Sequence, residues 1–160
     1  MSTRITCCQI PLRIGDTTGN RTTARTAIEQ AAAAGAQIVV LPELVPSGYV
    51  FADRAELESL AEPRDGATVA EWSDLAAAFG LVIVGGFPEA AGDRVYNSAV
   101  VVDPSGVLGV YRKTHLWDTE NAVFDLGDEP PLVVDTEHGR IGVMICYDVE
   151  FPEWVRAVSL

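Results

Sequence analysis

Few residues in this sequence can bind a metal or form a disulfide. Cysteine occurs only at Cys7, Cys8 and Cys146, and histidine only at His115 and His138. No CxxC, HExxH or GxxxxGK(S/T) pattern is present, which argues against a zinc site or a phosphate-binding loop of common spacing. An odd number of cysteines, two of them adjacent, does not fit a disulfide framework. We therefore expect free thiols, no metal and no other cofactor.

Basic residues and long apolar runs are also scarce. The chain has 11 Lys and Arg against 23 Asp and Glu, a formal net charge of -12, which disfavours nucleic acid and anionic membrane surfaces as partners. No apolar run approaches the roughly 20 residues of a membrane span, and the first residues lack the apolar segment of a secretory signal. We expect a cytoplasmic protein whose partner is a small uncharged or cationic molecule.

The rest of the composition is typical of one globular α/β domain. The 160 residues are 48% hydrophobic, which is enough for a sizeable core. Short apolar runs alternate with alanine-rich segments, as strands alternate with helices in α/β proteins. We predict strands at residues 3–10, 37–43 and 81–89, and helices at residues 20–36 and 66–80.

The second half of the chain is predicted to form two hairpins. β-rich runs flank the turn DPSG at residues 103–106 and the turn EHGR at residues 137–140. Between the hairpins, residues 114–131 are polar, and a connection of this length is often functional. Pro152 suits the first turn of a helix that continues to Leu160 without a stop signal. We therefore expect a piece of a longer protein, truncated at its C-terminus.

Three residues that can take part in catalysis each stand at the end of a predicted strand: Glu43, Lys113 and Cys146. In α/β proteins, ligands and catalytic groups collect at strand ends. A cysteine is a good nucleophile only as its thiolate, so it needs a base, and acyl transfer also needs a positive group or an N–H for the oxyanion. Each residue also has a structural interpretation, with Cys146 in the core, Glu43 as a cap and Lys113 as a solvated strand end.

Four segments carry a more specific signal: LPELVPSGY (41–49), YNSAVVVDPSG (96–106), YRKTHLW (111–117) and GVMICYDVEFPE (142–153). Together they resemble the carbon-nitrogen hydrolase, or nitrilase, superfamily. The similarity covers essentially the whole chain and includes the spacing between Glu43, Lys113 and Cys146. It implies that residues 1–160 are the N-terminal portion of one carbon-nitrogen hydrolase domain. The expected fold is a four-layer αββα sandwich of the nitrilase type, incomplete at its C-terminal part.

The resemblance implies a Glu-Lys-Cys triad that hydrolyses an amide. Glu43 would take the thiol proton while Cys146 attacks the carbonyl carbon. Lys113 and the backbone N–H of Tyr147 would stabilise the oxyanion. After the amine leaves, Glu43 would activate the water that releases the acid from the thioester. A buried lysine flanked by two carboxylates stays protonated, which suits this role.

The polar segment after Lys113 is expected to supply a fourth site residue, which would be the second carboxylate. The resemblance assigns Glu120, which would position the substrate or tune the triad, but Asp118 and Asp125 are close in sequence and a solvated acid is an alternative. His115 is expected to stabilise its loop by a hydrogen bond. Three aromatic residues near the site predict pocket walls, although core packing is equally compatible with them: Tyr49, Trp117 and Phe151.

The segment CYDVEFPE bears on the substrate. It is similar to the simple amidase groups and lacks the tryptophan expected after the cysteine in aromatic nitrilases, so amides are favoured, with N-carbamoyl amides and nitriles as alternatives. Glu150 stands where many relatives have arginine, which disfavours anionic substrates. A different alternative is an inactive fragment or pseudo-enzyme that only associates with other chains. The complete protein is expected to form a homodimer or a larger homo-oligomer.

Overall fold

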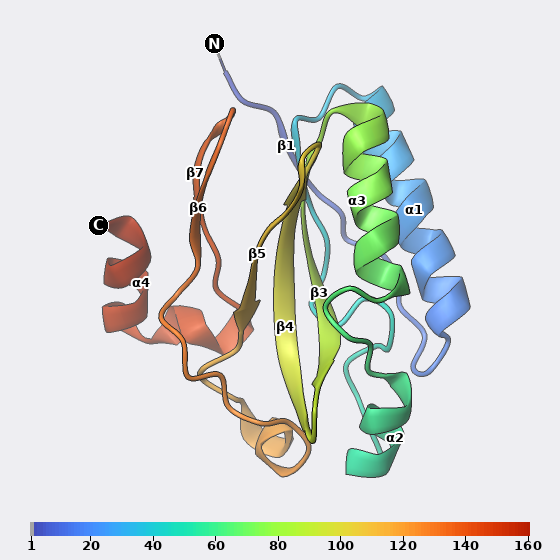
Figure 1. The fold of residues 1–160 in the computed structure, drawn as a ribbon, viewed down its shortest axis with the longest axis vertical. Coiled ribbons are helices and arrows are strands. Elements are labelled where there is room, and N and C mark those ends of the chain that lie inside the picture. Colours follow the sequence, from blue (N-terminus) through green and yellow to red (C-terminus); the bar gives the residue numbers. More distant parts are fainter. Residues whose placement is uncertain (1) are drawn as a thin grey trace.

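A computed structural model describes residues 2–160 (Figure 1). The helices are α1 (Thr17–Ala33), α2 (Arg54–Leu60), α3 (Ala67–Phe79) and α4 (Pro152–Ser159). The strands are β1 (Ile5–Cys7), β2 (Ile38–Val40), β3 (Val82–Ala91), β4 (Arg94–Asp103), β5 (Gly106–Arg112), β6 (Val133–Thr136) and β7 (Gly139–Gly142). Two 3-10 turns, Asp118–Ala122 and Cys146–Glu150, complete the elements.

A five-stranded sheet in the order β1-β2-β3-β4-β5 forms the centre. The first three strands are parallel, because helices connect them, whereas β4 and β5 are antiparallel and follow tight turns. Helices α1 and α3 cover one face, and the β6–β7 hairpin lies over the other with α4 outside it (Figure 1). The order helix, sheet, hairpin, helix confirms the predicted α/β fold class.

The pairing of β4 with β5 contains a β-bulge. Val102 of β4 pairs with Val107 of β5, but the preceding residue of β4, Val101, pairs with Gly109. Leu108 is therefore an extra residue in β5. Because side chains alternate between the two faces of a sheet, this extra residue fixes which face each later residue of β5 reaches.

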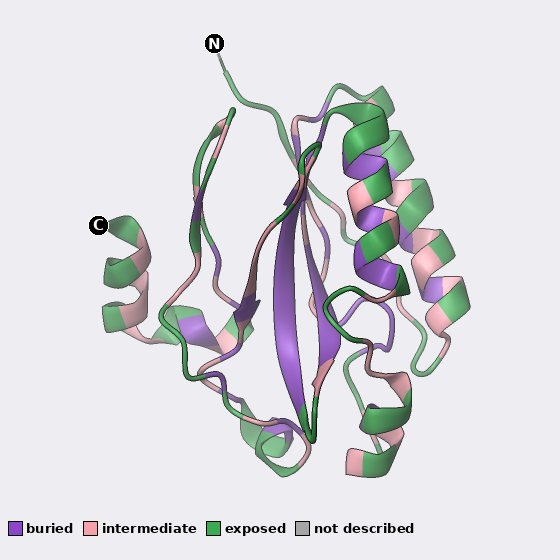
Figure 2. Ribbon diagram, viewed as in Figure 1, coloured by how far each residue is buried: buried purple, intermediate pink, exposed green. Residues whose placement is uncertain are grey.

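Two clusters of buried side chains hold the layers together. On the helix side, Trp72 of α3 packs on β3 at Gly85, where a Cβ would lie 2.5 Å from the indole ring. On the hairpin side, Val101 and Tyr111 pack with Val134 of β6. Full burial of a large apolar side chain stabilises a fold by about 1.5–3 kcal/mol. Figure 2 shows that β3 and β4 are buried along most of their length.

The predicted elements of the first half occur with shifted ends. Helix α1 begins at Thr17, before the predicted range, because Asp16 accepts a hydrogen bond from the Gly19 N–H at 3.0 Å and caps the helix. Strands β1 and β2 are shorter than predicted, since only three residues of each pair in the sheet. None of the helices in residues 2–160 is long and apolar enough to cross a membrane.

Helix α2 is an element that the sequence patterns above do not predict. Its N-terminus is closed reciprocally by two acids: the Asp53 carboxylate accepts from the Glu56 N–H at 2.9 Å, and the Glu56 carboxylate accepts from the Ala52 N–H at 2.6 Å. An acid followed three residues later by Glu is a helix-start signal that could have revealed the helix.

Candidate active site

The strand directions bring Glu43 and Lys113 to the same edge of the sheet. Glu43 follows the C-terminal end of β2, and Lys113 follows that of β5. The two strands run in the same direction, because β3 is parallel to β2 and the chain reverses twice between β3 and β5. Cys146 begins the 3-10 turn that follows the β6–β7 hairpin.

Backbone hydrogen bonds and one glycine fix the position of Glu43. On either side of it, the N–H groups of Leu41 and Val45 donate to the carbonyls of Val84 and Gly86 on β3, at 2.8 and 2.9 Å. A Cβ on Gly86 would lie 2.7 Å from the Glu43 Cα. Any side chain at position 86 would therefore displace Glu43.

Lys113 lies between two carboxylates. Its Nζ donates to Glu43 Oε1 at 2.8 Å and to both oxygens of Glu120 at 2.8 and 3.0 Å. Lys113 is 1% exposed and Glu120 4% exposed. Burial by itself lowers the pKa of Lys113, but the hydrogen bonds and charges of Glu120 and Glu43 outweigh it, so the pKa lies above its ordinary value. The ammonium group is therefore protonated at neutral pH.

The structure distinguishes Glu120 from the two neighbouring acids. Asp125 forms an ion pair with Arg54 at 2.8 Å and accepts the Val95 N–H at 2.9 Å, so it anchors the segment away from Lys113. Asp118 is exposed and starts the 3-10 turn with a φ of 47°. That turn directs Glu120 inward, where its Oε2 also accepts the Trp117 N–H at 2.6 Å.

Asn97 is a buried member of this cluster that the sequence reading missed. Its Nδ2 donates to Glu43 Oε1 at 2.6 Å and to Glu120 Oε1 at 2.8 Å, and the residue is fully buried. The amide therefore holds the two carboxylates at a fixed separation on either side of Lys113. In residues 2–160, Glu43 Oε2 accepts no hydrogen bond, which leaves this oxygen available for a proton. The sequence feature that could have indicated its role is a lone Asn within a largely apolar strand, since a buried polar side chain needs hydrogen-bond partners.

The thiol of Cys146 is exposed on a strained turn. Cys146 has a φ of 48°, a left-handed conformation that residues with a Cβ rarely adopt. The hydrogen bond that closes the turn runs from the Asp148 N–H to the Ile145 carbonyl at 3.1 Å. Burial and the charge of Glu43 raise the pKa of the Cys146 thiol, whereas Lys113 and the backbone N–H of Tyr147 lower it, and the net result is a raised pKa.

A cavity connects Cys146 with Glu43. Its volume is about 140 Å³, and its walls include both residues and Gly86. In the described residues no hydrogen bond joins the Cys146 thiol to Glu43 or Lys113, and Cys146 and Glu43 both line this space. A thiol and a carboxylate thus line one small volume, and the Lys113 ammonium is hydrogen-bonded to that carboxylate. These are the groups that acyl transfer needs.

Comparisons with known proteins agree with this geometry. A sequence model of the carbon-nitrogen hydrolase family matches residues 4–160. The chain belongs to the carbon-nitrogen hydrolase family. A protein named nitrilase from Pyrococcus abyssi is 44% identical over 142 residues, covering 88% of this chain and 54% of the relative. An (R)-stereoselective amidase from a Pseudomonas species is 37% identical over 156 residues, covering 98% of this chain and 56% of the relative.

A solved structure supports the nitrilase-type fold of this chain. It is a variant of the amidase from Nesterenkonia sp. AN1, with acrylamide attached by Michael addition at its active-site cysteine. The TM-score is 0.81 at 27% identity, and the match covers 98% of this chain and 62% of that one. The present chain spans about half the length of the curated relatives it matches.

Two further cavities adjoin the candidate site. Trp117 lines one of about 620 Å³ together with Cys146 and Glu150, and its ring meets Tyr147 edge-on at 4.7 Å. Tyr49 and Glu120 line another of about 350 Å³. Burial and the nearby charge of Glu120 raise the pKa of Tyr49 to about 12, so its hydroxyl stays protonated.

The other predicted residues lie beside the site. Phe151 lines neither cavity at Cys146; its ring stacks on His115 at 3.7 Å between centroids. His115 makes the expected loop hydrogen bond, to the Asp148 carboxylate. All three cysteines are free, with Cys7 exposed and Cys8 packed partly against the core. Within residues 2–160, no group of three or more His, Cys, Asp and Glu side chains is arranged to hold a metal ion.

Proposed function

We propose that this carbon-nitrogen hydrolase is an amidase with Cys146 as its nucleophile. The proposal rests on the buried Lys113 ammonium, held by Glu43 and Glu120 beside the cavity that Cys146 lines. The names of the relatives support carbon-nitrogen bond hydrolysis, and the acrylamide adduct of the Nesterenkonia amidase supports a cysteine nucleophile. Because the chain spans about half the length of its relatives, the proposal concerns the full-length protein.

Acylation begins with the protonated thiol. Because its pKa is raised, Cys146 keeps its proton until Glu43 removes it as the sulfur attacks the carbonyl carbon. The new C–S bond converts the carbonyl oxygen into an oxyanion, which the Lys113 ammonium and the Tyr147 N–H stabilise. Glu43 returns the proton to the leaving nitrogen, the C–N bond breaks, and a thioester remains on Cys146.

Deacylation uses the same groups in the same order. Glu43 takes a proton from water while the water oxygen attacks the thioester carbon. Lys113 and the Tyr147 N–H again stabilise the oxyanion, the C–S bond breaks, and the sulfur regains the proton from Glu43. Glu120 and Asn97 keep Glu43 and Lys113 in place through both half-reactions. The products are a carboxylic acid and ammonia or an amine.

The direct test is ammonia release from a panel of aliphatic amides by the full-length protein. Cys146→Ala should abolish turnover. Cys7→Ala is the matched control, because this thiol is also exposed but lies on β1, and it should keep wild-type turnover. In mass spectra of reactions stopped with acid, only proteins that keep Cys146 should carry the acyl group. Equal turnover by Cys146→Ala and wild type would contradict the nucleophile assignment.

The substrate panel should vary charge and reacting group. Glu150 lies on the wall of the larger cavity beside Cys146, so amides with a distal cation should react faster than matched anionic ones. Glu150→Gln should reduce this difference. Nitriles are a second candidate because of the relative named nitrilase, and the thiol could add to a nitrile carbon in the same site. Turnover of a nitrile without turnover of the matching amide would favour that activity.

A further inference from the structure

Asp148 is a buried carboxylate that the mechanism above does not use. It lies two residues after Cys146 and is 0% exposed. Oδ2 accepts hydrogen bonds from the Tyr111 hydroxyl at 2.8 Å and from the Ile145 N–H at 2.9 Å. Oδ1 accepts from the His115 N–H at 3.0 Å and lies 2.7 Å from His115 Nδ1. Three N–H or O–H donors and the His115 Nδ1 atom therefore converge on one carboxylate.

These donors come from the two segments that carry the proposed oxyanion lysine and the nucleophile. Tyr111 and His115 lie two residues before and two residues after Lys113. Ile145 immediately precedes Cys146. Bonds to an ionised acceptor are shorter and stronger than those between neutral groups. Asp148 thus cross-links the end of β5 to the turn of Cys146.

The turn needs such support because its backbone is strained. A non-glycine residue with a φ of 48° persists only where the surrounding structure holds it. Asp148 holds both sides of the turn, since its N–H donates to the Ile145 carbonyl and its side chain accepts the Ile145 N–H. Loss of the carboxylate would free the Ile145 N–H and allow Cys146 to relax.

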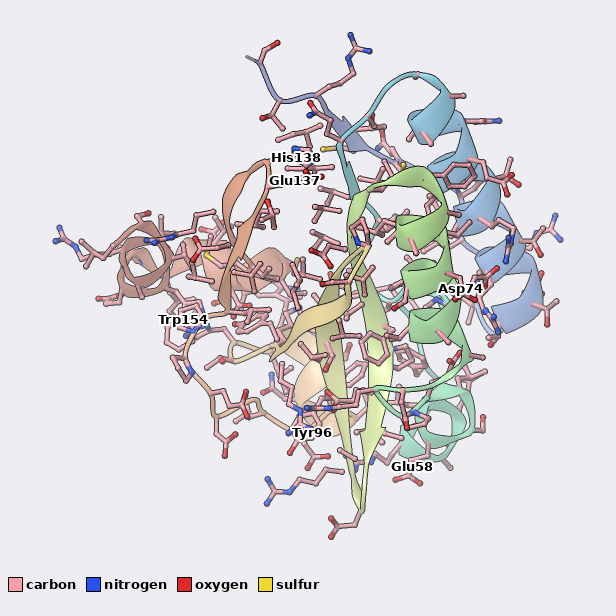
Figure 3. All side chains as sticks on the ribbon, turned by 45° about the horizontal axis from the view of Figure 1, so that its top comes forward. Glu58, Asp74, Tyr96, Glu137, His138 and Trp154 are labelled. Carbon is pink, nitrogen blue, oxygen red and sulfur yellow. The ribbon has the colours of Figure 1, made fainter. Side chains whose placement is uncertain are left out.

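Aromatic residues after the turn hold the donors themselves in place. Trp154 Nε1 donates to the Tyr111 hydroxyl at 2.9 Å, and the Phe151 ring stacks on His115 with an interplanar angle of 16°. Figure 3 shows Trp154 on the α4 side of the molecule, across the sheet from α1 and α3. Within the described residues, Ile145 is the one member of this network that lines a cavity at Cys146; Asp148, Tyr111 and His115 line neither of the two.

We propose that Asp148 is a positioning residue that sets the Cys146 sulfur and the Tyr147 N–H relative to Lys113 and Glu43. It acts through Tyr111, His115 and Ile145 and touches no substrate. The proposal rests on the proposed amidase function, since it concerns the geometry of the same nucleophile. A displacement of about 1 Å at a reacting centre can cost about 10²-fold in rate, so the effect of losing Asp148 should be large.

The test compares Asp148→Asn with wild type in the full-length protein. An amide keeps the shape but has one acceptor oxygen, and its NH₂ group would face donors. We expect kcat to fall about 10²-fold with KM little changed, because the transition state is affected more than substrate binding. The pH midpoint for alkylation of Cys146 by iodoacetamide should also move, since the thiol pKa depends on its position relative to Glu43, Lys113 and the Tyr147 N–H.

Two variants complete the design. Tyr111→Phe removes a single donor, so it should fold even where Asp148→Asn does not, and it should lower kcat less but move the same pH midpoint. Glu71→Gln is the matched control, because Glu71 on α3 pairs with Arg21 and Arg25 of α1 far from the turn. It should reduce stability while leaving kcat and the midpoint unchanged.

The outcomes separate the two proposals. Turnover by Cys146→Ala would overturn the amidase mechanism itself. If Cys146→Ala is inactive while folded Asp148→Asn, or Tyr111→Phe in its place, keeps the wild-type kcat and alkylation midpoint, Asp148 has only a structural role and the positioning proposal is wrong. A lower kcat together with a moved midpoint supports it.

Discussion

Two buried charge clusters lie back to back on opposite faces of the same sheet. On the face of α1 and α3, one carboxylate, Glu89, is shared by two arginines: Arg112 lies at 2.7 Å and Arg64 at 2.9 Å. The Ser98 hydroxyl donates to the same carboxylate at 2.7 Å. Burial raises the pKa of Glu89, but Arg112, Ser98 and Arg64 outweigh it, so the pKa lies below its ordinary value.

The cluster on the hairpin face has the inverse composition. Here one cation, Lys113, is shared by two carboxylates, and the polar neighbour is Asn97. Asn97 and Ser98 are adjacent on β4, and Arg112 and Lys113 are adjacent at the end of β5. Because successive side chains in a strand point to opposite faces, each neighbouring pair supplies one member to each cluster.

The difference shows what separates a structural ion cluster from a candidate site. Both clusters are buried and hydrogen-bonded, so burial of charge does not by itself indicate catalysis. The Glu89 cluster satisfies its carboxylate with guanidinium groups, which remain charged at all accessible pH values. The Lys113 cluster instead borders a cavity that also contains an exposed thiol. We expect mutations to affect stability on one face and activity on the other.

The largest expected effect is that of Lys113→Gln on activity. The substitution removes the positive charge that is proposed to stabilise the oxyanion, so kcat/KM should fall about 10³-fold, which corresponds to about 4 kcal/mol. Steady-state ammonia release by the full-length protein measures it. A fall of less than tenfold would mean that Lys113 does not stabilise the oxyanion, and the contrast between the two faces would disappear.

Arg112→Gln should instead lower stability and leave activity unchanged. It removes a guanidinium from a carboxylate that is 1% exposed, which should lower the free energy of unfolding by about 3 kcal/mol while kcat stays close to wild type. Urea denaturation measures the change. The control is Arg140→Gln, whose ion pair with Asp135 is exposed and should contribute less than about 1 kcal/mol. Equal losses in both variants would contradict the structural role of Arg112.

Extremes of pH should weaken the two clusters separately. The folded pKa of Glu89 is lowered, so its contribution to stability is present above its ordinary value of 4.5 and is lost as the pH falls through the folded value. The folded pKa of Lys113 is raised, so its contribution is present below its ordinary value of 10.5 and is lost as the pH rises through the folded value. Urea midpoints of wild type and Glu89→Gln should therefore converge in acid; a constant difference would argue against the linkage.

The smallest expected effects come from two adjacent residues of β4. Asn97→Ala removes hydrogen bonds to Glu43 and Glu120 and should lower kcat about tenfold. Ser98→Ala removes one bond to Glu89 and should cost about 1.5 kcal/mol of stability without changing kcat. Kinetics and urea denaturation of both variants provide the comparison. If the Ser98 variant loses activity and the Asn97 variant does not, the assignment of the two faces is reversed.

Local patterns were sufficient to predict much of this arrangement. Glu43, Lys113 and Cys146 each follow an apolar run, and the end of such a run is visible in the sequence itself. The hairpin turns at Asp103 and His138 were predictable for a similar reason, because the residue types of a turn are sufficient to recognise it. The choice of Glu120 over its neighbours was different, since it depends on the backbone of a 3-10 turn and on the partner of Asp125.

Residues whose importance comes from distant partners could not be predicted in this way. Asn97 looks like a weak strand residue until the fold places Glu43 and Glu120 around it. Asp148 looks like one acid among several after Cys146, and only the fold brings it into contact with Tyr111 of β5 and His115 of the following loop. In both cases the sequence separation is large and the side-chain direction decides the contact, so no local pattern carries the information.

The β-bulge at Leu108 determines which face of the sheet Arg112 and Lys113 reach. If Leu108 paired with Val101 instead of bulging, the shifted register would bring Arg112 opposite Asn97. The guanidinium would then face the hairpin side, and Lys113 would point toward Glu89. Each cation would still lie near a carboxylate, so the sheet could remain folded with the positions of Arg112 and Lys113 exchanged between its faces. Which cation lies beside Glu43 is therefore set by the register of the β4–β5 pairing as much as by the residues themselves.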